Sequence, residues 1–312
     1  MSERTNQEYL YIINYPTFEK ELALLELRSL FGRQIEDKFF YSELYIPPSR
    51  SVFLKVCITI LYKAGSLDDL VQLVAQNEVS YEDFKFVRFS VVGGELGYHE
   101  WVESATELGA VIQGEIDMFN PKHLLGVTCL RGQWVFGIFE KNENPWIEHD
   151  KKPHTYSNSL AVRTARSLVN VAVGPSTDIT LVDPCCGIGT VVIEAASMGI
   201  DVKGFEIKWQ IADKANKNLV YLGYERLITN SDMHKLTERY ATAILDLPYG
   251  VFTHTTPEKQ QALIRSLRRI ADRAVIITFE NTDETIEKVG FKIIDKATVS
   301  KGQFTRIIRV CE

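Results

Sequence analysis

Four acidic residues in the second half of the chain each follow an apolar segment. Asp183 ends "ITLVD", Glu206 ends "VKGFE", Asp232 lies in "ITNSDM" and Asp246 ends "AILD". A single acid in such a place is usually a solvated strand end or a helix cap. Four of them after successive strands would instead meet at one edge of a parallel sheet, where open α/β sheets bind ligands. The pattern therefore predicts one ligand site.

The segment "LVDPCCGIGT" (181–190) has the composition of a ligand-binding turn. Gly187 and Gly189 have no Cβ, so the backbone can approach a ligand closely, and the helix that follows supplies free N–H groups. Cys185 and Cys186 are adjacent and lack the spacing of zinc ligands. We interpret them as small apolar residues that pack the turn, and we predict no metal site.

Two other nucleotide-binding motifs can be compared with this turn. A dinucleotide fingerprint requires a third glycine where the chain has Val192, and the lysine of a P-loop is absent. Glu206, at the end of the next strand, is correctly spaced to bind the hydroxyls of a ribose. The sequence favours a ribose-containing ligand other than NAD.

The second half of the chain alternates strands and helices. The predicted strands span 179–183, 202–206, 227–230, 242–246, 274–279, 291–298 and 304–310. The predicted helices span 159–173, 189–198, 208–222, 257–271 and 282–289. This order predicts an α/β fold with a doubly wound, mostly parallel sheet of seven strands. The linker "SKGQ" is short enough to make the last two strands an antiparallel hairpin.

The first half has the mixed pattern of an α+β domain. The predicted strands are 9–14, 52–61, 84–92 and 134–140, and the predicted helices are 17–32 and 99–112. Thr17 is expected to cap the first helix and Gly32 to follow its end. The polar segment 140–159 contains two prolines, so it is the predicted linker between the domains.

The quoted motifs resemble those of one enzyme family. "DPCCGIGT", "GFEI", "SDM" and "DLPYG" are similar, in order and spacing, to motifs of Rossmann-like S-adenosylmethionine-dependent methyltransferases. They most resemble the THUMP-containing RNA guanosine-N2 methyltransferases, which include enzymes for position 10 of tRNA. Residues 115–139 resemble the end of a THUMP domain, and 9–32 resemble the segment that precedes it. The resemblance implies a THUMP-like, partly ferredoxin-like RNA-binding domain (1–145) and a methyltransferase domain (153–312).

The resemblance also assigns a cofactor site for S-adenosylmethionine. Asp183 and the glycine turn would hold the methionine moiety, because its ammonium group needs a carboxylate and its carboxylate needs N–H donors. Glu206 would bind the ribose. Asp232 would accept from the adenine amine, with the Met233 N–H nearby. The full set of cofactor residues is Asp183, Cys185, Gly187, Gly189, Thr190, Glu206, Ile207, Asp232, Met233 and Ser157.

The catalytic residues implied are Asp246, Leu247, Pro248 and Tyr249. In this assignment the Asp246 carboxylate and a backbone carbonyl hold an exocyclic amine in line with the methyl group, and Tyr249 stacks on the target base. The family's usual tetrapeptide is Asp-Pro-Pro-Tyr, so Leu247 replaces a proline. Leucine keeps the backbone carbonyl but loses the fixed φ of proline, which gives the loop more freedom.

Charge and composition limit the partners. The net charge is −6, of which we count −10 in residues 1–150 (13 basic, 23 acidic) and +4 in 151–312 (22 basic, 18 acidic). A polyanion would therefore meet the second half more favourably. Five cysteines without a pairing pattern and no secretory leader favour a cytoplasmic location. The expected partner is RNA, most specifically tRNA, and no binding to a membrane is expected. Whether the chain forms a homodimer or binds a small activator subunit stays open.

Three other functions share parts of this pattern. The same tetrapeptide occurs in amino-methyltransferases that act on DNA adenine or on protein glutamine, and the THUMP-like first half favours RNA over these. A catalytically silent methyltransferase fold that binds RNA would explain Leu247 and the acidic first half. An NAD-dependent oxidoreductase is disfavoured by Val192.

Overall fold

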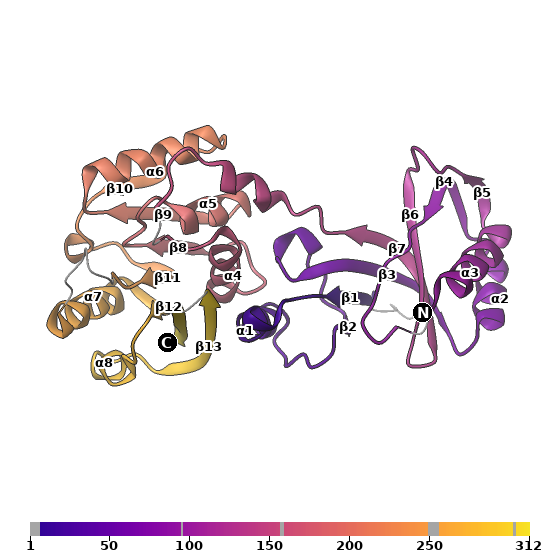
Figure 1. Ribbon diagram of the computed structural model, residues 1–312, viewed down its shortest axis with the longest axis horizontal. Coiled ribbons are helices and arrows are strands. Elements are labelled where there is room, and N and C mark those ends of the chain that lie inside the picture. The colour runs from indigo at the N-terminus through magenta and orange to yellow at the C-terminus, as the bar shows by residue number, and fades with distance from the viewer. Residues whose placement is uncertain (1–6, 95, 157–158, 249–255, 302–303) are drawn as a thin grey trace, which may run out of the picture. The chain divides into compact units, whose positions relative to one another are not determined.

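The computed structural model describes residues 7–94, 96–156, 159–248, 256–301 and 304–312, which form two compact units (Figure 1). The first unit contains the chain up to Asn14, Glu36–Ser49 and Phe53–Glu143. The second contains Tyr15–Ile35, Arg50–Val52 and Asn144–Glu312. No helix of the described segments is long and apolar enough to cross a membrane.

The first unit is a seven-stranded sheet of order β2-β1-β3-β7-β6-β4-β5. Its strands are β1 (Tyr9–Ile13), β2 (Phe39–Ser42), β3 (Leu54–Ala64), β4 (Ser80–Phe86), β5 (Gln113–Ile116), β6 (His123–Leu130) and β7 (Gln133–Lys141). Most neighbours are antiparallel, but β4 is parallel to both β5 and β6. The α+β prediction for this half agrees with the observed elements.

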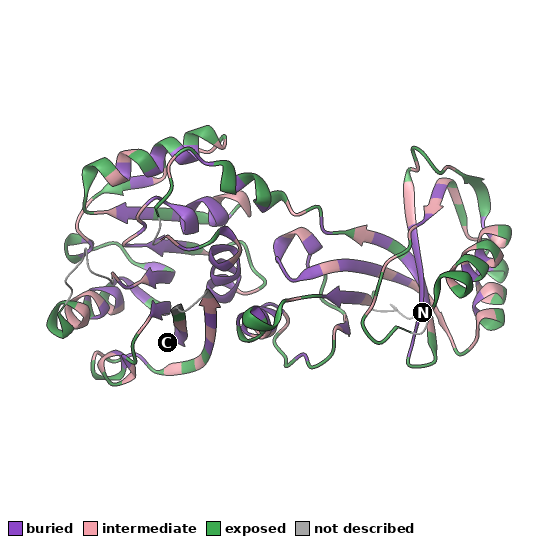
Figure 2. Cartoon of the chain, viewed as in Figure 1, coloured by how far each residue is buried: buried purple, intermediate pink, exposed green. Residues whose placement is uncertain are grey.

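Two helices, α2 (Leu67–Gln76) and α3 (Tyr98–Val111), pack on one face of this sheet. Leu70 of α2 and Leu108 of α3 are fully buried against Phe84 and Phe136. Ser66 caps α2 by accepting a hydrogen bond from the Asp69 N–H at 3.1 Å. Figure 2 shows the outer surfaces of both helices as exposed, so each buries a single apolar stripe.

The second unit contains the predicted doubly wound sheet, with seven strands in the order β10-β9-β8-β11-β12-β14-β13. The strands are β8 (Thr180–Asp183), β9 (Asp201–Glu206), β10 (Ile228–Asn230), β11 (Tyr240–Asp246), β12 (Ala271–Thr278), β13 (Ile293–Lys301) and β14 (Phe304–Cys311). The first five are parallel, while β14 is antiparallel to β12 and β13. The sequence thus predicted both the order of elements and the final hairpin.

The helices of this unit are α1 (Lys20–Phe31), α4 (Val162–Val173), α5 (Thr190–Ser197), α6 (Trp209–Tyr221), α7 (Pro257–Ile270) and α8 (Asp283–Lys288). Short 3-10 turns are η1 (Thr17–Glu19), η2 (Pro48–Arg50, which crosses between the units), η3 (Pro145–Lys151) and η4 (Met233–Lys235). Helices α7 and α8 cover one face of the sheet, where Ile264 and Ile286 pack with Leu245 and Leu247. Helix α4 contacts β11 and β12 from the other face.

Leu247, which replaces the family's proline, is tied to the core in two ways. Its side chain is 2% exposed within the cluster under α7. Its N–H donates to the carbonyl of Ile277 at 3.0 Å and so extends the β11–β12 pairing beyond Asp246. The residue is therefore held by packing and by a hydrogen bond that proline cannot make.

The chain divides differently from the predicted boundary at 145–153, because two earlier segments pack with the second unit. Helix α1 lies along β13, the edge strand of the second sheet. The Glu21 carboxylate accepts from the Thr298 N–H at 2.7 Å, and Arg28 pairs with Asp295 through two hydrogen bonds. An uncovered edge strand exposes unpaired N–H groups, so α1 protects this edge.

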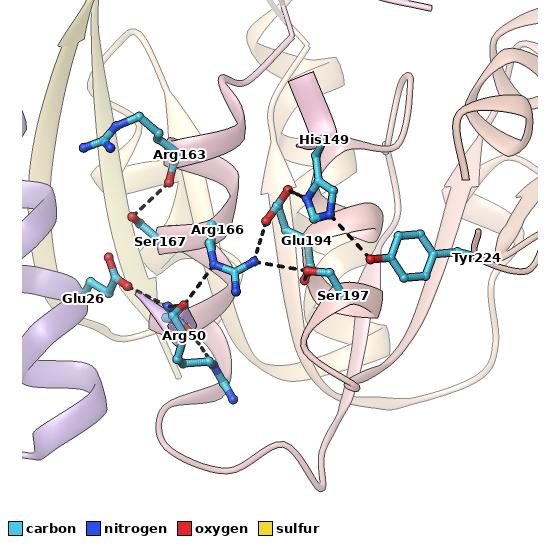
Figure 3. Close-up of polar contacts among 10 residues, drawn as sticks. Glu26, Arg50, His149, Arg163, Arg166, Ser167, Glu194, Ser197 and Tyr224 are labelled. Carbon is cyan, nitrogen blue, oxygen red and sulfur yellow. Dashed lines mark hydrogen bonds and ion pairs between the residues drawn. The ribbon is translucent and has the colours of Figure 1, made fainter. Parts of the chain in front are cut away.

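A buried polar network connects the segments of the second unit that enter it from different parts of the chain (Figure 3). Glu194 of α5 is fully buried and accepts hydrogen bonds from His149 Nδ1 at 2.5 Å and Arg166 Nη1 at 2.8 Å. Asn170 of α4 bonds Glu26 of α1 at 2.6 Å and also accepts from Arg50 at 2.6 Å. Charged groups this deeply buried need such partners, and the network fixes α1, η3 and α5 around α4.

Several local predictions were wrong. Thr17 does not cap α1, because a 3-10 turn precedes the helix and Glu19 occupies the N-cap position. Gly32 does end it, with φ of 69°. The helix predicted from 159 begins at Val162, and the strand predicted at 84–92 ends at Phe86. The sequence also gave no separate prediction for β2, α2 and β5.

We expect Glu194→Ala to destabilise the second unit by about 3–5 kcal/mol, because it leaves Arg166 and His149 buried without their acceptor. Glu148→Ala is the matched control: its ion pair with Lys151 is exposed, so the loss should be below about 0.5 kcal/mol. Urea unfolding followed by the fluorescence of buried Trp146 measures both. Equal stability of the two variants would contradict the role given to the network.

We expect Leu247→Pro to destabilise the protein by about 1–3 kcal/mol, since it removes the N–H that pairs with Ile277 and the side chain in the core. The melting temperature should fall by several degrees. Leu247→Val keeps the N–H and most of the packing, so its melting temperature should lie near that of the parent. A Leu247→Pro protein as stable as the parent would show that the hydrogen bond is unimportant.

Candidate active site

A cavity of about 420 Å³ opens at the carboxyl edge of the second sheet. The turns that follow β8, β9, β10 and β11 line it, and all four acids predicted from the sequence are among its lining residues: Asp183, Glu206, Asp232 and Asp246. Strands β9, β8 and β11 are neighbours in the sheet, so parallel pairing brings their ends together.

The β8–α5 turn brings a buried carboxylate and exposed backbone to the cavity. Asp183 is 5% exposed and accepts from the Cys185 N–H at 3.2 Å. Gly187 has a φ of 54°, and a Cβ there would project into open space within the cavity lining. Any side chain at this position would both strain the backbone and fill part of the space for a ligand.

Gly189 has a different role from the one the sequence assigned to it. Its N–H donates to the Cys186 carbonyl at 2.8 Å, so it is not a donor for a ligand. A Cβ at Gly189 would approach Ile228 Cδ1 to 2.7 Å, and the backbone φ is 83°. Glycine is needed here for the turn and for its close packing on β10. Thr190, the next residue, is 4% exposed and its hydroxyl has no partner among the described atoms.

Glu206 is positioned by the turn after β9. Its Oε1 accepts from the Lys208 N–H at 2.8 Å, and its backbone carbonyl accepts from the Ser231 N–H and the Asn230 amide. Ile207, beside it, is 64% exposed and lines the cavity. The turn therefore presents one carboxylate and one exposed aliphatic side chain to a ligand.

Asp232 and Met233 form the third wall. The Asp232 carboxylate accepts from the His234 N–H at 2.9 Å. Met233 is 3% exposed, and its sulfur lies 3.5 Å from Cys185 Sγ. Burial raises the pKa of the Cys185 thiol, and the neighbouring acids raise it further. The thiol is therefore protonated and packs as an apolar group. The described residues contain no cluster of three or more metal-ligating side chains.

Asp246 has an unusual environment for a carboxylate. Its Oδ1 is buried and has no hydrogen-bond partner among the described atoms. Burial raises its pKa to about 7, against the opposing effect of the Arg306 guanidinium. Burial also raises the pKa of Asp183 to about 8; the Cys185 N–H opposes this, and nearby Asp246 and Glu206 add to it. The pKa values of both neighbouring carboxyl groups are thus raised into the physiological range.

Two predicted site residues, Ser157 and Tyr249, lie outside the described residues. Pro248 and Leu247 line the cavity beside Asp246. Ser159 lines the cavity too and donates to the Tyr156 carbonyl at 2.8 Å. Most apolar lining was missed by sequence reasoning: Tyr156, Leu160, Ile188, Val191, Ile211 and Leu263, together with polar Lys208 and His234. Ile211 lies four residues after the predicted site residue Ile207, and this spacing was the one sequence feature that indicated a missed lining residue.

These features fit S-adenosylmethionine. The buried Asp183 carboxylate suits an ammonium group. The Thr190 hydroxyl, for which the described atoms offer no partner, suits the methionine carboxylate together with the open backbone of Gly187. Glu206 suits a ribose diol, and Asp232 an exocyclic amine. The apolar walls suit an adenine ring.

The chain is also similar in sequence to known methyltransferases. Residues 149–289 match the family model of the RMKL-like methyltransferase domain. The chain is 26% identical over 274 residues to the tRNA (guanine(10)-N2)-dimethyltransferase of Methanothermobacter thermautotrophicus, covering 78% of this chain and 79% of that protein. It is 25% identical over 217 residues to the enzyme of the same name from Pyrococcus abyssi, covering 64% and 65%.

Among solved structures, TrmN from Thermus thermophilus aligns over 98% of this chain and 99% of its own, with a TM-score of 0.48 and 14% identity. Residues 149–289 are thus similar to a family of methyltransferase domains, and the chain is similar in sequence to the two tRNA methyltransferases over most of its length.

Proposed function

We propose that the chain transfers a methyl group from S-adenosylmethionine to the exocyclic N2 amine of a guanosine in tRNA, at position 10. The observation that carries this proposal is the buried Oδ1 of Asp246, which has no hydrogen-bond partner among the described atoms and lies in the lining of a cavity suited to the cofactor. The names of the relatives supply the nucleotide and the RNA.

In this proposal the ends of β8, β9 and β10 bind the cofactor. Asp183 pairs with the ammonium group, Glu206 binds the ribose hydroxyls and Asp232 accepts from the adenine amine. Met233 and Ile207 pack against the adenine ring. When bound, the cofactor supplies an electrophilic methyl group on its sulfonium sulfur.

Asp246 positions the amine to be methylated. The lone pair of an exocyclic amine is delocalised into the base, so the amine is a weak nucleophile. The Asp246 carboxylate and the Leu247 carbonyl each accept one N–H of the amine, which directs the nitrogen toward the methyl group. Pro248 and Tyr249 follow directly, and Tyr249 is proposed to stack on the base.

The raised pKa of Asp246 also suits it to accept a proton after methyl transfer. Once the N–C bond has formed, the nitrogen must lose a proton. A carboxylate whose pKa is about 7 can accept that proton and return it to solvent at neutral pH. The same residue can therefore serve as hydrogen-bond acceptor before transfer and as base after it.

The first unit is proposed to be THUMP-like and to select the RNA, while residues 153–312 perform the transfer. Because the first half has an excess of acidic residues, its affinity for tRNA would come from a few local basic residues or from the shape of the tRNA. The proposal includes a cytoplasmic location, which a tRNA substrate would support. A homodimer or a small activator subunit would add RNA-binding surface without changing the chemistry.

Asp246→Ala should leave cofactor affinity nearly unchanged and lower kcat by about two orders of magnitude, roughly 3 kcal/mol of barrier. Asp246→Asn should lose less, because an amide carbonyl can still accept a hydrogen bond. Asp201→Ala is the control, since Asp201 is exposed at the opposite end of β9. Methyl transfer to unmodified tRNA compares the four proteins. An Asp246→Ala enzyme as fast as the parent would exclude Asp246 from the mechanism.

Cofactor binding should release roughly one proton per chain at pH 7. Asp183, with a pKa of about 8 in the free protein, carries a proton that must leave before it pairs with an ammonium group. Affinity should therefore rise as the pH increases from 6 toward 8. Calorimetry in buffers with different ionisation enthalpies counts the proton.

Asp183→Asn should abolish this release and weaken binding by about 1–3 kcal/mol. Binding by the parent without any buffer dependence at pH 7 would refute the assigned pairing.

A further inference from the structure

Arg306 of β14 lies on the same face of the second sheet as Asp246. Asp246 pairs with Ile277 of β12, and Ile277 pairs with Ile308 of β14. Residues that lie opposite each other on paired strands point to the same face of a sheet, and so do residues two apart on one strand. Arg306 lies two residues before Ile308, so its side chain points to the same face as that of Asp246. Leu245 and Leu247 point to the α7 face, which places Arg306 and Asp246 on the α4 face.

The guanidinium of Arg306 is held by an aromatic ring. Its Cζ lies 5.0 Å from the centroid of Phe279, the residue that follows β12. A guanidinium stacked on a ring keeps its planar row of donors in a defined orientation. Both side chains are half-buried, so they remain partly open to solvent.

Arg306 is on the far side of Asp246 from the cofactor cavity. The sheet order β8-β11-β12-β14 puts Arg306 two strands beyond Asp246 and three beyond Asp183. The described residues that line the cavity include Asp246 and Pro248 but neither Arg306 nor Phe279. Its guanidinium is nevertheless close enough to lower the pKa of Asp246 against the larger effect of burial. A base whose amine contacts Asp246 would thus lie between the cofactor and Arg306.

We propose that Arg306, stacked on Phe279, recognises the guanine by donating hydrogen bonds to its O6 and N7 while Asp246 holds its N2 amine. This inference rests on the proposed function. Guanine presents O6 and N7 as acceptors, and a bidentate arginine is the usual partner of that edge. Adenine has a donor amine in place of O6, and an arginine has donors only. Arg306 therefore supplies the choice of guanine over adenine, which an amine-binding tetrapeptide alone cannot make.

The test uses the full chain and tRNA that carries either guanosine or 2,6-diaminopurine at the methylated position. The second base keeps the 2-amine but has an amine in place of O6. Single-turnover transfer by the parent should favour guanosine by about 10-fold or more. Arg306→Ala should slow transfer to guanosine by a similar factor and bring the ratio of the two rates close to one.

Two further variants make the result specific. Arg306→Lys keeps the charge near Asp246 but cannot donate a planar pair of hydrogen bonds, so the ratio should fall while the pH profile stays unchanged. Arg268→Ala is the matched control, since Arg268 of α7 lies over Phe291 at the same 5.0 Å but is not among the described residues that line the cavity, so it should keep the parent's rates. Melting curves of all the variants identify any that unfold.

The alternative outcomes separate the two proposals. If Arg306→Ala slows both substrates equally and keeps the preference, Arg306 acts only through Asp246 or through the fold, and the inference is wrong while the proposed function stands. If the parent transfers no methyl group to guanosine in any tRNA, the proposed function fails and the inference fails with it.

Discussion

The burial of two neighbouring carboxyl groups, Asp183 and Asp246, is the constraint on which the site depends. They end adjacent parallel strands, so neither can move away from the other. Removing both from water favours their neutral forms, which is why the pKa values rise to about 8 and about 7. A cation bound beside Asp183 would lower the free-energy cost of ionising that buried carboxyl group. An amine that donates to Asp246 would do the same for the second carboxyl group. The free site is therefore arranged to gain stability from its ligands.

The rest of the second unit keeps these groups in place. Helix α5 starts at Thr190, at the end of the β8–α5 turn, and Glu194, one turn later, anchors it to His149 and Arg166. Helix α1, which comes from a distant part of the sequence, covers the edge strand β13 and joins the same network through Glu26. A domain limited to residues 153–312 would lack both α1 and His149. The methyltransferase fold in this chain thus includes segments that precede and follow the first unit.

Sequence reasoning succeeded where the signal is local. The strands of the second unit are short apolar runs that alternate with helices, whose apolar residues recur at helical spacing. An acidic residue ends or follows four of these strands. It failed where pairing between distant residues decides the outcome. The Gly189 N–H is used inside its own turn, and the Leu247 N–H bonds to Ile277 thirty residues away. In the first unit, the run "FKFVRFSVV" reads as one strand, but β4 ends at Phe86 and Phe89 packs against the core from outside the sheet.

The central claim is that the exocyclic amine of a guanine is the methyl acceptor. The most direct measurement is mass spectrometry of nucleosides from unmodified tRNA after incubation with the full chain and S-adenosylmethionine. The account predicts N2-methylated guanosine, produced by the parent and nearly lost with Asp246→Ala. Methylated adenosine as the product, or tight cofactor binding without any methylated nucleoside, would contradict it.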